Sequence, residues 1–145
     1  MTQPQPLRFR PDARLLRQVR DGARASALRL GAPPEQCDAV SLVVDELVNN
    51  AIEHGACYRR TENELVVRVG TTQGRLTIDF VDPDMPEPLV HELARSLAEA
   101  ANGTPSLENE RGRGLFLISI YMEELRIDVA PGGGLHLHGR LATSG

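Results

Sequence analysis

The chain has 145 residues, of which 41% are hydrophobic and 25% are charged, and its formal net charge is −4. This length and composition predict one globular domain with a substantial core. The acidic balance and an aromatic content of 3% argue against a nucleic-acid-binding protein, which needs a basic face or stacking side chains. The sequence has no apolar run near the roughly 18 residues of a membrane span, no apolar signal region and only two cysteines, so we expect a cytoplasmic protein that acts at no membrane.

The sequence of the first 31 residues predicts a tail, a strand and a helix. Residues 1–6 contain two prolines and little that can pack, so we expect a mobile tail in front of a single domain at 7–145. Leu7–Arg10 alternates as a strand does. Asp12 can cap the helix that follows, because its carboxylate accepts from the free N–H groups of the first turn, and Gly31 is a suitable stop.

The second helix is the most informative segment. It begins at Pro33-Pro34, because proline is tolerated in the first turn of a helix, and it runs to about His54 with Gly55 as its stop. At about 100° per residue, apolar side chains share one side of this helix and polar side chains the other. The apolar side comprises Val40, Val44, Leu47, Val48, Ala51 and Ile52, and the polar side Asp45, Glu46, Asn49, Asn50, Glu53 and His54.

The remaining elements predict an antiparallel sheet with two more helices. First, we expect a hairpin of strands at 65–69 and 76–80, with its turn at Gln73-Gly74 and its second strand ending at Asp82. A helix over about 88–101, closed by Asn102-Gly103, and a mobile polar stretch at 104–111 should follow. A helix from Gly112–Gly114 to about Met122 and a hairpin at 125–129 and 135–141 complete the chain. Strands joined by tight turns are antiparallel, and one-sided helices must cover a face of their sheet. The predicted fold is an α/β (α+β) two-layer sandwich with a mainly antiparallel sheet covered on one face by helices.

One group of polar residues with potential chemistry lies on the second helix. Glu46, Asn50 and His54 are spaced i, i+4 and i+8, and they fall within an arc of about 80°. The carbonyl oxygen of an asparagine suits a hard cation such as Mg²⁺, and a carboxylate one turn earlier can accept a proton beside that cation. Taken alone, the pattern is more typical of the solvated face of an amphipathic helix.

Two further features complete the set of candidate residues. Asp82 ends a strand, where its carboxylate can accept a hydrogen bond from the amino group of a base, although aspartate also favours plain turns. Gly112-Arg113-Gly114 stands at a predicted helix start, where free backbone N–H groups and the helix dipole suit a phosphate. Each feature is weak by itself. Together, in the order helix, strand end and helix start, they predict a nucleotide pocket.

This combination resembles the GHKL ATPase superfamily, which has the Bergerat fold, and within it the bacterial anti-sigma-factor serine kinases. The N-box of that family reads E-L-x-x-N-A-x-x-H, and Glu46–His54 matches every specified position. Gly112–Ile118 is similar to the G2-box of the family. The resemblance spans roughly residues 7–141, and it implies a protein that binds ATP with Mg²⁺.

The resemblance also implies a role for each matching residue. Asn50 would bind Mg²⁺ between the phosphates, and Glu46 would be the general base that activates a serine hydroxyl of the partner. Asp82 would contact the amino group of adenine. The two glycines and Arg113 of Gly112-Arg113-Gly114 would lie against the phosphates, and His54, which closes the N-box, would be a further contact.

The family implies a regulatory activity and its partners. The chain would be an ATP-dependent protein serine/threonine kinase that phosphorylates a serine of a STAS-domain anti-sigma-factor antagonist. It would also sequester a sigma factor and thereby regulate transcription. Members of this family commonly form homodimers, so a homodimer is expected here too.

The sequence departs from the family in one motif, the G1-box. The family pattern is Asp-x-Gly-x-Gly, whereas this chain reads Asp82-Pro-Asp-Met-Pro86 and lacks both glycines. Proline fixes φ and removes a backbone donor, so we expect a stiffer loop. This departure favours an alternative, namely a catalytically weak or inactive nucleotide-binding module that regulates by partner binding only.

Two other readings find less support in the sequence. A fragment of a sensor histidine kinase needs a phosphoacceptor histidine ahead of the ATPase domain, but the first histidine of this chain is His54. His136 and His138 share one face of a predicted strand, but no third ligand is evident, so a metal site is not expected there.

Overall fold

The computed structural model describes residues 5–59, 63–101 and 110–142. The elements run in the order β1 (Leu7–Phe9), a 3₁₀ turn η1 (Ala13–Leu15), α1 (Leu16–Arg29), α2 (Pro34–Gly55), β2 (Leu65–Thr72), β3 (Arg75–Asp82), α3 (Glu87–Ala101), α4 (Glu110–Tyr121), β4 (Met122–Val129) and β5 (Leu135–Leu141). The predicted tail at 1–6 lies mostly outside the described residues, and the predicted helix end at Asn102-Gly103 lies entirely outside them. Residues 104–109 of the predicted mobile stretch at 104–111 are also outside, while its last two residues, Glu110 and Arg111, belong to α4 instead. No helix in the described ranges is both long enough and apolar enough to cross a membrane.

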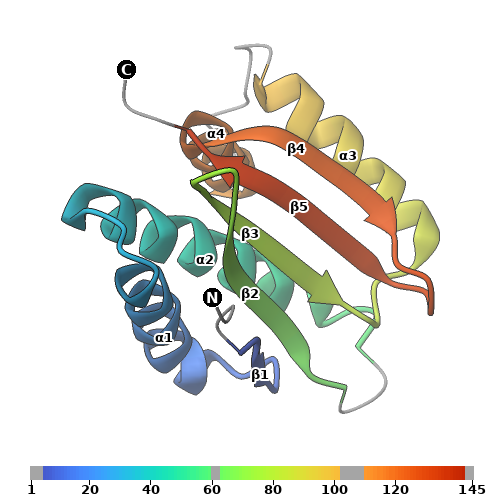
Figure 1. Cartoon of the computed structure of the whole chain (residues 1–145). Helices are drawn as coiled ribbons and strands as arrows, with labels where there is room; N and C mark the ends of the chain where they lie inside the picture. Colours follow the sequence, from blue (N-terminus) through green and yellow to red (C-terminus); the bar gives the residue numbers. More distant parts are fainter. Residues whose placement is uncertain (1–4, 60–62, 102–109, 143–145) are drawn as a thin grey trace.

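The strands form one sheet with the order β1-β2-β3-β5-β4, and every neighbouring pair is antiparallel. The four α-helices lie on one face of this sheet (Figure 1). Alternate strand residues point to that face and are buried beneath the helices. They include Leu65, Val67, Val69, Leu76, Ile78, Phe80, Leu135 and Leu137. The predicted two-layer sandwich is therefore confirmed.

The long helix α2 forms the centre of the helical layer. Its predicted apolar side is buried, with Val40, Val44, Leu47, Val48 and Ala51 each no more than 5% exposed. The prediction of its end was off by one residue, because Gly55 is the last helical residue and Ala56 is the cap. The helix contacts α4, β3 and β5, so the polar N-box residues Glu46, Asn50 and His54 have a defined position relative to these elements.

Both predicted hairpins are confirmed. Gln73 and Gly74 have φ angles of 53° and 78°, and these positive values are what the tight turn between β2 and β3 requires. The second hairpin differs from the prediction in its first strand, since β4 begins at Met122 instead of near residue 125. A register irregularity in β4 between Glu123 and Arg126 accounts for the difference, because it breaks the alternation that strand prediction relies on.

Of the three other α-helices, α3 lies where it was predicted, over Glu87–Ala101, whereas α1 and α4 differ from their predictions at their starts. The helix after Asp12 begins as the 3₁₀ turn η1, and Asp12 accepts the predicted capping bond from the backbone N–H of Arg14 at 2.9 Å. α4 begins at Glu110, so Gly112 and Gly114 lie inside its first turns instead of before them. Glutamate and arginine have good helix propensity, which outweighs the two glycines here.

Candidate functional site

The carboxylate of Glu46 on α2 lies directly against the backbone of Gly114 in α4. A Cβ atom placed on Gly114 would lie only 2.6 Å from Glu46 Oε2, a separation that real Cβ atoms essentially never show. Only glycine therefore fits at this point without displacing the carboxylate. The structure thus brings together one residue from each of the two motifs.

Asn50 follows one turn later on the same side of α2 and lines a small cavity. The cavity has a volume of about 10 Å³, which is room for at most about one water molecule. Its other walls come from β3, the β3–α3 loop, α3, α4 and β5, and include Phe80, Met85, Leu93, Leu97, Leu115 and Leu135. We call Glu46, Asn50 and Gly114 the Glu46 end of the site.

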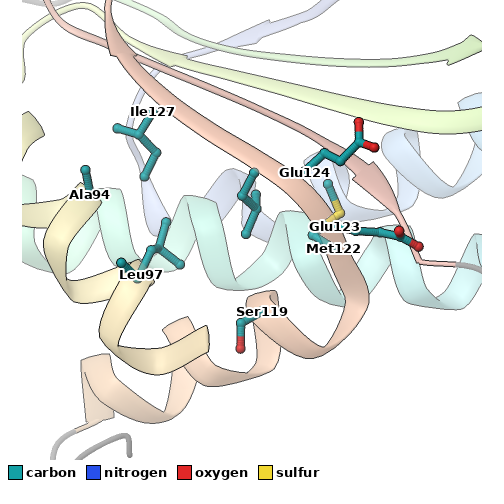
Figure 2. A pocket seen from close by; sticks show the side chains of 9 residues that line it. Ala94, Leu97, Ser119, Met122, Glu123, Glu124 and Ile127 are labelled. Carbon is teal, nitrogen blue, oxygen red and sulfur yellow. The ribbon is translucent and has the colours of Figure 1, made fainter. Parts of the chain in front are cut away.

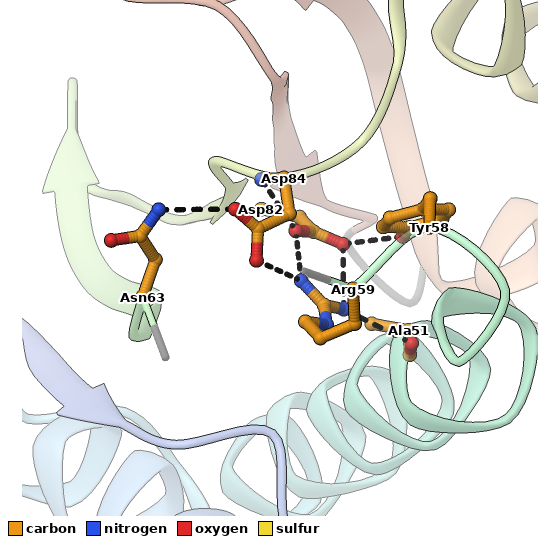
Figure 3. Close-up of polar contacts among 6 residues, drawn as sticks. All are labelled: Ala51, Tyr58, Arg59, Asn63, Asp82 and Asp84. Carbon is orange, nitrogen blue, oxygen red and sulfur yellow. Dashed lines mark hydrogen bonds and ion pairs between the residues drawn. The ribbon is translucent and has the colours of Figure 1, made fainter. Parts of the chain in front are cut away.

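Asp82, at the end of β3, is completely buried, and donors surround its carboxylate (Figure 3). The hydroxyl of Tyr58 donates to Oδ2 at 2.6 Å. The guanidinium of Arg59 donates to Oδ1 at 2.6 Å and to Oδ2 at 3.1 Å. The backbone N–H of Asp84 donates to Oδ1 at 3.1 Å. We call Tyr58, Arg59, Asp82, Asp84 and Met85 the Asp82 end.

Arg59 connects Asp82 to the helix that carries the N-box. Its Nη2 atom donates to the backbone carbonyl of Ala51 at 3.3 Å, and its Nη1 atom lies 3.4 Å from a carboxylate oxygen of Asp84. A Cβ atom placed on Gly55 would lie 2.5 Å from Nη2, so the guanidinium passes over the end of α2 at a point that only glycine leaves open. The Glu46 end and the Asp82 end are therefore linked through α2 and one arginine.

The protonation states of these donors are fixed by their surroundings. Burial, followed by the hydrogen bond and the negative charge of Asp82, raises the pKa of Tyr58 above its ordinary value. Burial alone lowers the pKa of Arg59, but the hydrogen bonds and charge of Asp82 outweigh it, so the pKa of Arg59 is raised. At physiological pH, Tyr58 is therefore a neutral donor and Arg59 is a cation.

The other residues predicted for the site are less enclosed. His54 is exposed near the end of α2, and its side chain makes no hydrogen bond or ion pair with the residues that the structure describes. Gly112 and Arg113 belong to the first turns of α4, but the side chain of Arg113 lies outside the described part of the chain. The structure therefore brings together Glu46, Asn50 and Gly114, with Asp82 connected to them through Arg59.

Comparison with known protein families agrees with this arrangement. The model of the histidine kinase-like ATPase domain matches residues 9–137, which is most of the chain. The chain belongs to this ATPase family. The match confirms the resemblance to the GHKL superfamily that the N-box and G2-box indicated. It also includes the residues of the departing G1 loop, so the loop is a variation within a member of the family.

A solved structure has the same fold. The chain is similar to a protein in the crystal structure of the SiaB-SiaC complex from Pseudomonas aeruginosa, with a TM-score of 0.74 and 17% identity over 94% of this chain and 88% of the other. At this identity the likeness concerns the fold. No curated protein sequence gives a significant match.

Sequence reasoning missed two residues of this ATPase domain, Tyr58 and Arg59. They belong to no motif, and they lie 24 and 23 positions before Asp82, the residue that they contact. A buried carboxylate needs partners, but sequence periodicity does not show which residues return to it. The one usable signal is Gly55, which allows the chain after α2 to fold back over the helix end.

A second hollow of this domain lies away from the N-box. It is a groove of about 470 Å³ between α3, α4 and β4, lined by Ala94, Leu97, Ala98, Ser119, Met122, Glu123, Glu124, Leu125 and Ile127 (Figure 2). The side chain of Leu97 borders both this groove and the cavity at Asn50. The two glutamates of the groove already pair with Arg75 and Arg140. The groove is therefore mainly an apolar surface.

The histidines of β5 contact an aspartate on the sheet face opposite the helices. Nε2 of His136 and Nδ1 of His138 both lie 2.8 Å from Oδ1 of Asp79. Within the described ranges, no group of three or more His, Cys, Asp or Glu residues has the arrangement of a metal site. The three residues act here as a hydrogen-bonded cluster across β3 and β5.

Proposed function

We propose that this ATPase domain is an ATP-dependent protein serine kinase of the anti-sigma-factor type. The observation that carries the proposal is the contact of Glu46 with Gly114, because it joins the N-box carboxylate to the helix that carries the G2 glycines. Asn50 stands one turn away on the same helix side. Glu46 could thus accept a proton, and Asn50 beside it could supply an oxygen ligand for Mg²⁺. Both lie near the start of α4, and phosphoryl transfer needs such a combination.

The chemistry of the side chains fits Mg²⁺ and an adenine nucleotide. Asn50 has an amide oxygen of the kind that Mg²⁺ accepts, and the first turns of α4 have the free N–H groups that suit phosphate. Asp82 has the acceptor that an exocyclic amino group needs. The cavity of about 10 Å³ at Asn50, in contrast, is far below the roughly 300 Å³ of a small-molecule site, so binding requires Met85 or the side chains of α3 to move.

Each residue of the chain then has one task. Bound Mg-ATP supplies a phosphoryl group that can pass to a hydroxyl. Asn50 holds the metal through its side-chain oxygen, and Asp82 selects adenine. Glu46 accepts the proton of the attacking serine hydroxyl, and Gly112, Arg113 and Gly114 hold the phosphates. His54 is the least enclosed of the set, and we assign it a contact at the edge of the site.

The proposed partners are those that the resemblance to anti-sigma-factor kinases implies. The phosphorylated serine would belong to a STAS-domain anti-sigma-factor antagonist, and the second partner would be a sigma factor that the chain sequesters in the cytoplasm. The chain would act as a homodimer. A solved relative by fold is known in a two-protein complex, which supports a partner-binding role for this fold.

A second function is favoured by the Asp82 end. There the G1 glycines are replaced, and the carboxylate already has protein donors. The chain would then be a nucleotide-binding module that regulates by partner binding, with little or no phosphate transfer. A stable complex with the partner and no transfer under saturating Mg-ATP would favour this function over the kinase.

Thermal unfolding with and without Mg-ATP tests nucleotide binding. At 100 times its Kd, a ligand stabilises the folded state by about 2.7 kcal/mol, so the Tm of the wild type should rise by roughly 5–10 °C. The shift should disappear in Asn50→Ala and after removal of Mg²⁺ with EDTA. Asn49→Ala is the matched control on the same helix, and it should keep the full shift. Equal shifts in both variants would contradict the role of Asn50.

Phosphate transfer tests the kinase itself. With a STAS-domain antagonist as acceptor, radiolabelled ATP should give a phosphoserine product with the wild type. Glu46→Ala should lower the rate by roughly 100- to 10,000-fold, the usual contribution of a general base, while Mg-ATP still raises its Tm. An unchanged rate in Glu46→Ala would overturn the assignment of Glu46.

A further inference from the structure

We propose that Arg59 is a built-in competitor for the nucleotide. Its guanidinium occupies the carboxylate of Asp82 that the amino group of adenine would use, so nucleotide binding must first release it. This inference rests on the proposed function, and it adds a residue that sets the affinity of the site.

The first step of the argument is the saturation of Asp82. An ionised carboxylate has about four acceptor positions, two on each oxygen. Oδ1 accepts from Arg59 Nη1 and from the N–H of Asp84, and Oδ2 accepts from Tyr58 and from Arg59 Nη2. Four donors thus fill four positions (Figure 3). A fifth donor, from any ligand, must displace one of them.

The second step is to identify the donor that can leave. The N–H of Asp84 belongs to the loop that begins at Asp82 itself, so it cannot leave without rebuilding that loop. Tyr58 and Arg59 belong to a turn after α2, where the N–H groups of both residues bond to the carbonyl of Gly55. Ala56 and Cys57 in this turn are exposed. The two side chains can therefore swing towards solvent while the helices and strands remain in place.

The third step concerns the apolar part of the same region. Met85, only 8% exposed, stands where the family has a glycine-containing loop, and it lines the 10 Å³ cavity beside Asn50. Methionine is unbranched and adapts its shape readily, so it can open space that a branched side chain could not. At the Asp82 end, Tyr58 and Arg59 thus fill the polar positions around the carboxylate, and Met85 fills the apolar space beside it.

The consequence for affinity is quantitative. If only a fraction of the molecules has Arg59 released, the observed Kd is the intrinsic Kd divided by that fraction. Removing the guanidinium makes the open form the main one. The observed affinity should then increase by roughly tenfold or more, which corresponds to about 1.4 kcal/mol.

Three variants measured by calorimetry with Mg²⁺ and the non-hydrolysable ATP analogue AMP-PNP test the proposal. Arg59→Met keeps the aliphatic stem and removes the charge, and it should bind at least about tenfold more tightly than the wild type. Tyr58→Phe removes one donor and keeps the ion pair, and it should bind a few-fold more tightly. Arg24→Met is the matched control, because Arg24 on α1 pairs with the exposed Asp38 near the start of α2, and it should bind like the wild type.

A measurement on the wild type makes the test independent of the folding of Arg59→Met. The side-chain nitrogen signals of Arg59 in an NMR spectrum should shift when AMP-PNP and Mg²⁺ are added, and those of Arg24 should not. Binding with unchanged Arg59 signals, or Arg59→Met that binds no more tightly than the wild type, overturns the proposal and leaves the nucleotide function intact. No binding to any of the four proteins overturns both.

Discussion

The Glu46 end and the Asp82 end both retain the acidic residue of their motif, but the two carboxylates have different surroundings. Glu46 is half-buried, and its Oε2 atom lies against a glycine with no room for a side chain. Asp82 is fully buried, and four protein donors surround it. At one end, the chain keeps the small residue that the motif requires. At the other end, Asp84 and Pro86 stand at the two glycine positions, and Arg59 pairs with the carboxylate of Asp82.

The difference teaches that a motif residue can be present and yet have all its hydrogen-bonding positions taken by other residues of the same chain. A buried acidic group costs several kcal/mol unless it is paired, so a chain that keeps Asp82 without a resident ligand must supply partners of its own. Tyr58 and Arg59 supply them here. The Asp82 end is therefore paired within the chain itself, and under the proposed function a nucleotide would have to displace this pairing.

The largest effect is expected from Asp82→Asn. The substitution removes the closer of the two carboxylates that pair with Arg59, whose side chain is only 13% exposed, and leaves it the longer contact with Asp84 at 3.4 Å. Breaking a buried pair in this way costs about 3–5 kcal/mol, which lowers Tm by roughly 6–20 °C. Asp38→Asn breaks the exposed pair with Arg24 and should cost less than about 1 kcal/mol. Similar losses of stability in the two variants would mean that the ion pair of Asp82 contributes no more to the free energy of unfolding than a surface ion pair does.

Met85→Ala should also destabilise the chain, because it enlarges the cavity at Asn50. Truncation of a buried methionine costs about 2–5 kcal/mol, and thermal unfolding measures it. The same variant should show a larger Tm increase with Mg-ATP than the wild type, since the space is already open. Leu28→Ala, at a residue that is 57% exposed, is the control and should change the stability by less than about 0.5 kcal/mol. A smaller nucleotide shift in Met85→Ala would show that Met85 supports binding instead of occupying the site.

Gly114→Ala tests the Glu46 end. Alanine normally stabilises a helix relative to glycine by about 0.5–1 kcal/mol, but here its Cβ would collide with Glu46 Oε2. The carboxylate is the movable end of its side chain, so it must turn aside and lose its present contacts. We therefore expect a small net loss, at the low end of the roughly 1–3 kcal/mol that overpacking costs. The double variant Glu46→Ala with Gly114→Ala removes the collision and should recover the loss, which a double-mutant cycle measures. Gly132→Ala is the control, because nothing lies within 4 Å of its Cβ position. Additive effects would exclude the contact.

The smallest effect concerns Asp12, an exposed acid outside both ends. Its hydrogen bonds to Arg14 lower the pKa of the Asp12 carboxyl from 3.8 to about 2. Since the folded pKa is the lower one, the stabilisation is complete above the unfolded pKa and is lost as the pH falls from about 4 to 2. An NMR titration should give a midpoint near 2. The Tm of Asp12→Asn should therefore fall less than the Tm of the wild type when the pH is lowered from about 4 to 2. A midpoint at 3.8 would rule out the capping pair.

Much of the fold could be predicted, because it depends on local patterns. The alternation of β2 and β3, the turn at Gln73-Gly74 and the apolar stripe of α2 were all predicted from the sequence. The irregular start of β4 was missed, since its register shift breaks the period-2 pattern. Of the site, the N-box and the second G2 glycine were predicted and do meet. The partners of Asp82 were not, because Tyr58 and Arg59 reach it only through the tertiary fold.

The irregularity in β4 has a consequence for solubility. β4 is an edge strand of the sheet, and Glu124 within it has a φ of 55°, while its carboxylate pairs with Arg140. An edge strand of regular geometry offers a row of free backbone groups on which another chain can polymerise. The kink at Glu124 interrupts that row and puts a charge beside it. The backbone groups of this edge are thereby less suited to pair with a strand of another chain.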